Sequence, residues 1–241
     1  MSSDTLVVDF FGDETIVIPS DVNKNIIKNI LIKEGFTILN GNQFYGFPVL
    51  NNIKSPNSLV TINDNGFSLS YLLKYLLLPK NVKNIATTNP FDYGLIEYID
   101  VDPENPYFSS VDGVLFSKDM KILYEFPICK NVTSYLIPNT VSRVAFGAFN
   151  RARYLKKIYI PDSVVDLSAQ FCFDNHDTLN EVIVYRYYKQ KVPYIGSQSF
   201  MHTTFQESNI TYIYSINVMK TCTSCFSSFL KSVLLCLWIS E

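Results

Sequence analysis

Apolar and polar positions recur along this chain with a period near 23 residues. Residues 141–163 read VSRVAFGAFNRARYLKKIYIPDS, which gives the pattern VxxVxxxAFxxAxxLxxIxIP. The next unit starts at Val164 and keeps the same apolar slots with one residue inserted, and a third unit starts at Val192. Self-similarity at a fixed period of about 20 to 50 residues is the signature of a solenoid or another repeat array.

One unit predicts a short strand, a turn, a second straight segment and a corner. Ile158 and Ile160 alternate with Tyr159, as on a strand with one buried face, and Pro161 ends the strand because it has no N–H for a ladder. Ala148 and Phe149 bring a small and a large side chain inward at a tight turn that we expect to be helical. One coil cannot enclose these residues, so coils must stack to bury them. The predicted core positions are Val141, Val144, Phe149, Leu155, Ile158, Ile160, Phe173, Leu179, Val182, Ile195 and Phe200.

The end of the strand recurs upstream of this unit. The tetrapeptides IVIP (16–19) and YLIP (135–138), and the segment YLLLP (75–79), resemble IYIP (158–161), and each precedes a polar pair and a Val. The intervals between these motifs support four or five coils, with a diverged region near the N-terminus. Between about 102 and 131 the chain carries an insertion in which VLF and ILY flank residues 117–121, a pattern that predicts a β-hairpin projecting from the edge of the coils.

Taken together, IPDSV, the AF pair, LxxIxIP at 23-residue spacing and NPYFSSVDGVLFSKD closely resemble BspA-like leucine-rich repeat proteins. The resemblance covers about residues 76–216 well and 13–40 weakly. It implies a leucine-rich repeat solenoid of the curved α/β horseshoe type, with short parallel strands, short helical turns and an inserted β-hairpin. We divide the chain into a diverged repeat or cap region (1–70), the repeats (71–217) and a Cys-rich apolar segment (218–241).

The resemblance also implies a class of function. Members of this family are largely surface or secreted proteins of bacteria and parasitic protists that adhere to host matrix proteins or cells. The expected function is therefore a non-enzymatic module that binds such a protein, and the alternative is an intracellular scaffold in the cytoplasm. The first residues, MSSDTLVVDFFGDETIVIP, lack the basic and apolar regions of a secretion signal, which favours the alternative. Uncovered terminal coils would allow self-association.

Composition excludes some partners. The 241 residues are 47% hydrophobic and 17% charged, which suits a large buried core, and the formal net charge of -2 comes with no dense run of Lys and Arg. We therefore expect no nucleic-acid partner. The apolar segment SVLLCLWIS (232–240) is about half as long as the roughly 20 residues that span a bilayer, so a membrane span is not expected.

The chain shows no catalytic or metal-binding constellation. Its two histidines are His176 and His202, and His176 occupies the packing slot that Ala152 fills in the preceding unit. Cys172 with His176, and Cys222 with Cys225, are too far apart in sequence to predict a compact zinc site. The alternating acids from Asp100 to Glu104 lack the glycine and the final glutamate of a calcium loop. We expect no enzyme activity, no cofactor and no metal.

One surface cluster suggests a binding role. The stretch YRYYKQ stands where IPDSV would be expected, and aromatic residues and arginine are enriched at protein interfaces. The alternative is that alternate tyrosines pack on the adjacent coil while Arg186 and Lys189 are solvated. The candidate partner-binding residues are Tyr185, Arg186, Tyr187, Tyr188 and Lys189.

Overall fold

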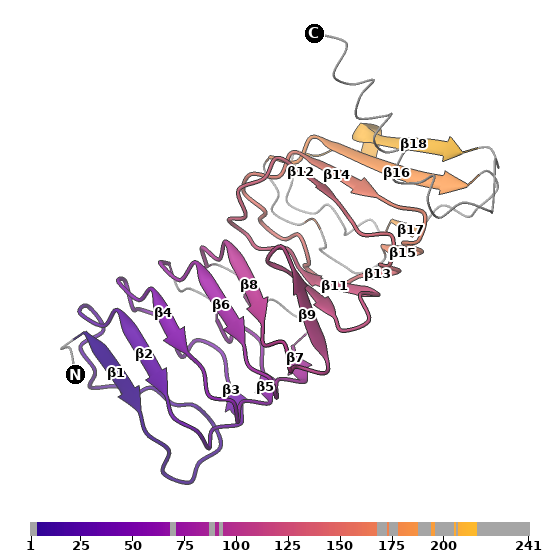
Figure 1. Ribbon diagram of the computed structural model, residues 1–241. Coiled ribbons are helices and arrows are strands. Elements are labelled where there is room, and N and C mark those ends of the chain that lie inside the picture. The colour runs from indigo at the N-terminus through magenta and orange to yellow at the C-terminus, as the bar shows by residue number, and fades with distance from the viewer. Residues whose placement is uncertain are drawn as a thin grey trace.

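The chain winds into an elongated solenoid of about seven turns, built almost entirely from short parallel strands (Figure 1). The computed structural model describes residues 4–67, 71–86, 90–91, 94–167, 173, 178–187, 194–195, 205 and 207–215. The predicted leucine-rich repeat solenoid is confirmed. The turn count exceeds the four or five coils expected from the sequence.

Each coil contributes a strand to a row that we call the first ladder. Its parallel pairs are β1–β2–β4, β6–β8 and β12–β14–β16–β18, and β4 lies beside β6 (Figure 1). The bounds are β1 Thr5–Val8, β2 Asn29–Ile32, β4 Asn52–Lys54, β6 Tyr75–Leu78, β8 Tyr98–Val101, β12 Ser134–Leu136, β14 Lys157–Ile160, β16 Glu181–Tyr187 and β18 Ile210–Ser215.

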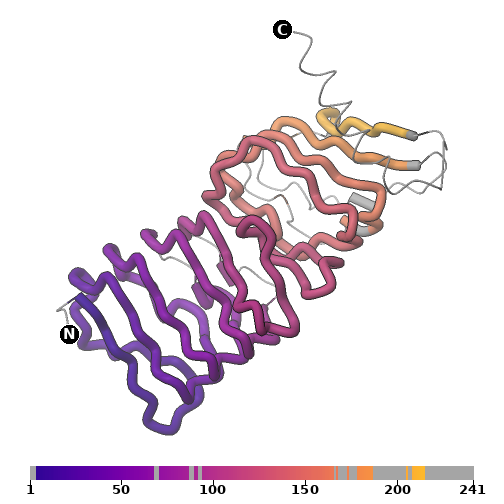
Figure 2. Tube along the Cα trace, viewed as in Figure 1, coloured from indigo at the N-terminus to yellow at the C-terminus, as the bar shows by residue number. Residues whose placement is uncertain are grey.

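A second ladder runs along the other side of the coils, as the Cα trace shows (Figure 2). Three of its strands are in register with a spacing of 23 residues per coil: Ile38 pairs with Thr61, and Thr61 pairs with Asn84. The bounds are β3 Ile38–Leu39, β5 Thr61–Ile62, β7 Asn84–Ile85, β11 Ile122–Glu125, β13 Arg143–Val144, β15 Asp166–Leu167 and β17 Tyr194–Ile195.

The corner after the second ladder is not helical. Around Phe149 the chain makes successive four-residue turns, in which the Ala148 N–H donates to the Ala145 carbonyl and the Asn150 N–H donates to the Gly147 carbonyl. Gly147 has φ of 64° and Arg151 has φ of 56°, so left-handed residues interrupt the right-handed geometry that a helix requires. The expected short helical turns are therefore wrong.

Helix is scarce in the described part of the chain as a whole. There the only helical segment is the 3-10 turn Glu207–Asn209. None of the helical structure assigned to those residues has the length and apolar character needed to cross a bilayer.

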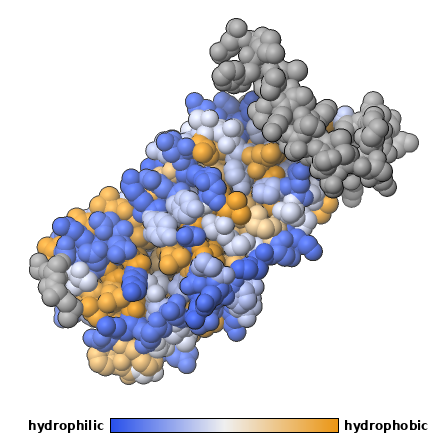
Figure 3. Space-filling model, in the orientation of Figure 1, coloured by the Kyte–Doolittle hydropathy of each residue, from blue (hydrophilic) through white to orange (hydrophobic). Residues whose placement is uncertain are grey.

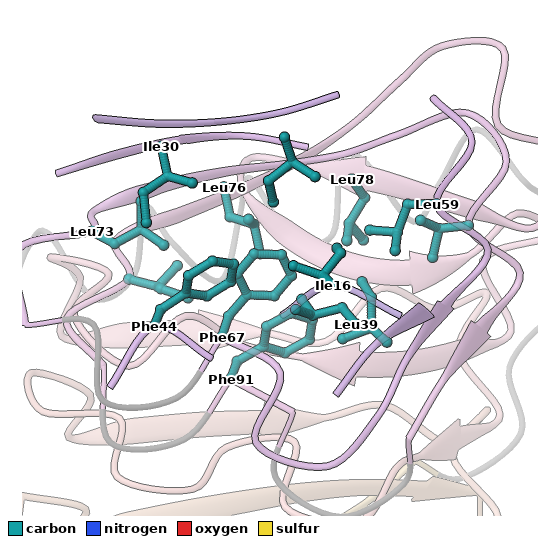
Figure 4. Close-up of a cluster of buried hydrophobic side chains, with 14 of the residues drawn as sticks. Ile16, Ile30, Leu39, Phe44, Leu59, Phe67, Leu73, Leu76, Leu78 and Phe91 are labelled. Atoms are coloured by element: carbon teal, nitrogen blue, oxygen red, sulfur yellow. The ribbon is translucent and has the colours of Figure 1, made fainter. Parts of the chain in front are cut away.

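Stacked phenylalanine rings occupy the interior of successive coils. Phe44, Phe67 and Phe91 lie one above another with ring centroids 5.6 and 6.2 Å apart, surrounded by aliphatic side chains (Figure 4). Phe149 stacks between Phe126 and Phe173, at 5.3 and 5.4 Å. Phe200, expected to extend this stack, and the Ile195 side chain lie outside the described residues. The buried members of the predicted core are Val141, Val144, Phe149, Leu155, Ile158, Ile160, Phe173, Leu179 and Val182.

The insertion forms an antiparallel meander of β9 (Phe108–Val111), β10 (Val114–Ser117) and β11. The predicted hairpin between VLF and ILY is confirmed as β10–β11. It does not project from the coils, because all three apolar residues of β10 are buried: Leu115 packs in the N-terminal core, and Val114 and Phe116 pack in the C-terminal core. A strand that is apolar at every position is suited to burial on both faces.

The N-terminal coils are more regular than the sequence motifs suggested. Thr15 bridges Ile38, so Ile16 belongs to the second ladder. The segment IVIP (16–19) therefore does not occupy the slot of YLLLP, whose Leu76 and Leu78 lie on β6 of the first ladder. In the first coil that slot is filled by β1, which ends at Val8 without a proline.

Candidate functional site

The outer face of the first ladder carries the side chains that alternate with the buried core positions. On β6, Leu76 and Leu78 are buried, while Tyr75 and Leu77 point away from the core and are exposed. Such an alternation leaves one face of each strand available to solvent or to a partner. This outer face is the candidate site, because it holds exposed apolar residues side by side.

We call Tyr75, Leu77 and Tyr98 the tyrosine platform. They are 52%, 44% and 37% exposed, and the two rings stack with centroids 5.9 Å apart and planes inclined by 14°. One coil before Tyr75 stands Asn52, whose amide contacts that of Asn29, so the outer face changes from polar to aromatic at β6. Clustered exposed aromatic side chains are the surface feature most typical of protein-binding sites.

A hydrogen bond fixes the first ring of the platform. The Tyr75 hydroxyl donates to Asp100 Oδ2 at 3.0 Å. Desolvation raises the pKa of Tyr75, and the hydrogen bond to Asp100 raises it further. Tyr75 therefore stays neutral at physiological pH and presents an ordered, amphipathic ring.

The tip of the β9–β10 hairpin covers the other ring. Asp112 and Gly113 both have positive φ, 51° and 78°, as in the two-residue turn that suits a twisted hairpin. A Cβ on Gly113 would lie 2.6 Å from Tyr98 Cδ2, so only glycine lets the tip rest on this ring. Lys130 Nζ holds the tip through the Asp112 carboxylate at 2.9 Å, and its side chain is almost buried.

Two buried polar side chains donate hydrogen bonds to equivalent turns, which follow strands of the first ladder. Asn105 donates from Nδ2 to the carbonyls of Pro79 and Val82, both at 2.9 Å. Arg186 plays the same part in the C-terminal half of the solenoid, where it donates to the carbonyls of Pro161 and Val164 at 2.9 and 2.8 Å. Each therefore satisfies the Pro-x-x-Val turn of the preceding coil.

The predicted partner-binding cluster divides accordingly. Arg186 is buried, so it is neither solvated nor presented to a partner, contrary to both interpretations of the sequence. Tyr185 is half-buried and stacks on Tyr159 at 6.4 Å, and burial raises its pKa. The Tyr187 side chain, Tyr188 and Lys189 lie outside the described residues.

Chemistry other than binding finds little support in the described ranges. These ranges hold no group of three His, Cys, Asp or Glu side chains placed to bind a metal ion. Cys129 is buried, and desolvation raises the pKa of its thiol, which makes it a poor nucleophile. Asp102 accepts the Glu104 N–H, which accounts for the acidic turn as local structure. His176, His202 and the remaining cysteines lie outside the described residues.

The repeat motifs did not predict the tyrosine platform. Its signal is the alternation in YLLLP, where the positions that alternate with the buried leucines hold Tyr75 and Leu77 instead of polar residues. On the displayed face, hydrophobic patches are interrupted by hydrophilic residues, so exposed apolar surface is local and not continuous (Figure 3).

Comparison with known proteins agrees with this architecture. A model of the BspA type leucine rich repeat region matches residues 14–118 and 121–235, in six copies. The structure is similar to the pneumococcal vaccine antigen PcpA, with a TM-score of 0.54 and 20% identity over 81% of this chain and 68% of that one. It is also similar to a leucine rich cell surface protein of Faecalibacterium prausnitzii, with a TM-score of 0.51 and 18% identity over 77% of this chain and 62% of that one, less than two thirds of its length. No curated protein sequence matches the chain.

Proposed function

Because the chain belongs to the BspA-type leucine-rich repeat family, we propose that it is a non-enzymatic module displayed at a cell surface, where it binds a host matrix or cell-surface protein. Repeat solenoids use their extended faces to bind other macromolecules, and each coil can vary its outer residues without disturbing the core. A role in protein interaction is what this architecture supports best.

The observation that carries the proposal is the tyrosine platform. These three residues, Tyr75, Leu77 and Tyr98, are large and apolar or aromatic, yet they are exposed, whereas most other large apolar side chains of the described residues pack in the two cores. Tyrosine supplies large contact area at low cost in conformational entropy, and it accepts both apolar and polar neighbours. We place the partner's contact on this part of the outer face.

A binding assay tests the interaction. The full chain is immobilised and exposed to a panel of purified extracellular matrix proteins and cell-surface ectodomains. Saturable binding to at least one member is expected, and binding that remains equal to that of a non-repeat control protein across the panel would contradict the proposal.

The surface location needs its own measurement. It is supported by the similarity in fold to a vaccine antigen and to a cell surface protein. Antibody labelling of intact cells should detect the native protein. Labelling that appears only after permeabilisation would replace the surface role with that of an intracellular scaffold.

A further inference from the structure

Hydrogen-bonded pairing in the first ladder breaks between β4 and β6, which still lie side by side, and again between β8 and β12, where the meander enters. Tyr75 and Tyr98 lie 23 residues apart, whereas Tyr98 and Ser134 lie 36 apart, and β8 and β12 do not pair. The hairpin tip takes the place of the missing neighbour of β8: Ile99 N–H donates to the Gly113 carbonyl at 3.0 Å, and the Ile99 carbonyl accepts a hydrogen bond from the Ser110 hydroxyl. The backbone of β8 is therefore satisfied on that edge.

The facing edge of β12 is different. Lys157 N–H donates to the Thr133 carbonyl at 3.1 Å, and Ile137 N–H donates to the Tyr159 carbonyl at 3.0 Å. Since backbone groups alternate along a strand, the odd-numbered residues of β12 point to β14, and Ser134 and Leu136 point the other way. Within the described part of the chain, the N–H groups of Ser134 and Leu136 have no hydrogen-bond partner.

This edge of β12 is exposed. Ser134 is exposed, Leu136 is 44% exposed, and Asn131 and Thr133 just before the strand are exposed too. Natural proteins guard a free edge with a short strand, a lysine, a proline or a bulge; β12 is short, at three residues, but contains no lysine, proline or bulge. The hairpin tip is anchored at β8, because Lys130 pairs with Asp112 and Gly113 rests on the Tyr98 ring.

We propose that the free edge of β12 is a strand-addition site for an extended segment of a partner protein. The N–H groups of Ser134 and Leu136 are two residues apart, a repeat of about 7 Å, which the backbone of an extended peptide matches. An apolar side chain of the added strand packs on exposed Leu136. The inference rests on the proposed function in that the partner is a protein, and it adds how that partner is recognised.

A matched pair of variants isolates the backbone donor. Ser134→Pro removes the outward N–H and leaves the hydrogen bonds between β12 and β14 in place, because those use the odd-numbered residues. Ser134→Ala removes the hydroxyl and keeps the N–H. Loss of binding in Ser134→Pro alone therefore indicates recognition of the main chain, whereas loss in both variants indicates recognition of the hydroxyl.

The probe is a phage-displayed library of random linear peptides selected on the full chain. The enriched peptides are synthesised, and their affinities are measured for the unaltered chain and both variants. Affinity should be unchanged in Ser134→Ala and at least about tenfold weaker in Ser134→Pro. Amide hydrogen exchange of the unaltered chain should show protection of Ser134 and Leu136 on peptide binding, a readout that holds even if Ser134→Pro folds poorly.

Four results would overturn the inference. These are equal affinity for the two variants with no protection at β12, failure to enrich any peptide, loss of binding in Tyr75→Ala/Leu77→Ala alone, and a dimer of the free chain that Ser134→Pro abolishes. The third shows that the selected peptides bind the tyrosine platform and not β12, which leaves the proposed function intact. The fourth makes a second copy of the chain the occupant.

Discussion

At the scale of single residues, the stacked phenylalanines are among the largest fully buried side chains of the solenoid. Phe149 is fully buried, and its ring stacks between those of Phe126 and Phe173 in the neighbouring coils. Phe149→Ala should lower the free energy of unfolding by about 3 to 5 kcal/mol, as truncation of a large core side chain does. Chemical denaturation measures the change.

The control for this substitution must be an exposed residue. Arg151, which the repeat pattern marks as surface, is half-buried and has φ of 56°, so it is unsuitable. Lys156→Ala removes an exposed side chain and should change stability by less than about 0.5 kcal/mol. Equal midpoints for the Phe149 and Lys156 variants would show that the assigned register is wrong.

Asn105 is the second residue whose removal should be costly. Its side chain donates to two carbonyls and accepts the N–H groups of Tyr107 and Phe108, at 2.8 and 2.9 Å, so every polar atom is used. Asn105→Ala leaves buried carbonyls unpaired and should cost about 2 to 3 kcal/mol. Exposed Asn139→Ala, measured in parallel, should be nearly neutral. A neutral Asn105→Ala variant would mean that water replaces these bonds.

Residue identities predicted the core far better than they predicted the buried polar residues. Isoleucine, leucine and phenylalanine side chains that recur at the repeat spacing are stable only in the interior of the coils, so the buried position of Phe149 could be predicted. Asn105 and Arg186 read as surface residues, because their partners are carbonyls of a turn one coil away and about 25 residues earlier in sequence. No local pattern contains that information.

Tyr135 gives the molecule a dependence on alkaline pH. Burial against Phe126 and Phe149 raises the pKa of its hydroxyl well above the ordinary value of 10.0. As pH rises past that value, the unfolded chain loses this proton first, so the folded state loses stability. Stability should decline above about pH 10, and Tyr135→Phe should decline less steeply. Identical pH profiles for the two proteins would contradict this.

At the scale of elements, the hairpin tip is positioned by one glycine. Gly113→Ala introduces both a left-handed residue with a Cβ, at φ of 78°, and a contact with the Tyr98 ring. The substitution should cost about 2 to 4 kcal/mol, of which about 1 to 2 is backbone strain. In a Tyr98→Ala background only the backbone cost should remain.

A double-mutant cycle of Gly113→Ala and Tyr98→Ala measures the interaction free energy between these two positions, and its sign can be predicted. The two substitutions together should destabilise less than the sum of their separate effects, by about 1 to 3 kcal/mol. Additive effects would show that the tip does not rest on the ring.

The parallel strands could be predicted from apolar residues that alternate along a short segment ending in proline. The hairpin could be predicted from two apolar runs, VLF and ILY, on either side of a polar turn. The helical turns could not, since an Ala-Phe pair is compatible with a helix and the left-handed residues Gly147 and Arg151 decide otherwise. The placement of the hairpin was also wrong, although VLF carried the signal: three consecutive apolar residues fit a strand buried on both faces better than one that projects.

At the scale of the whole molecule, two hydrophobic cores meet at β10. The N-terminal core extends from Val8 to Leu115, and the C-terminal core starts at Val114. Sequence motifs located the C-terminal core, two of whose coils carry the related turns IPNTV (137–141) and IPDSV (160–164). They missed the regularity of the N-terminal coils, which keep the interior phenylalanine positions, Phe44, Phe67 and Phe91, while changing the turns.

The central claim is that a protein partner contacts the outer face of the first ladder at the tyrosine platform. The most direct test is the affinity of a partner from the matrix and cell-surface panel for two variants, Tyr75→Ala/Leu77→Ala and Tyr154→Ala. Tyr154 is about as exposed as Tyr75 but lies outside the strands of either ladder, so it controls for general loss of exposed aromatic surface. We predict at least about a tenfold loss of affinity for the platform variant and no change for the control. Equal affinities for the two variants would contradict the claim.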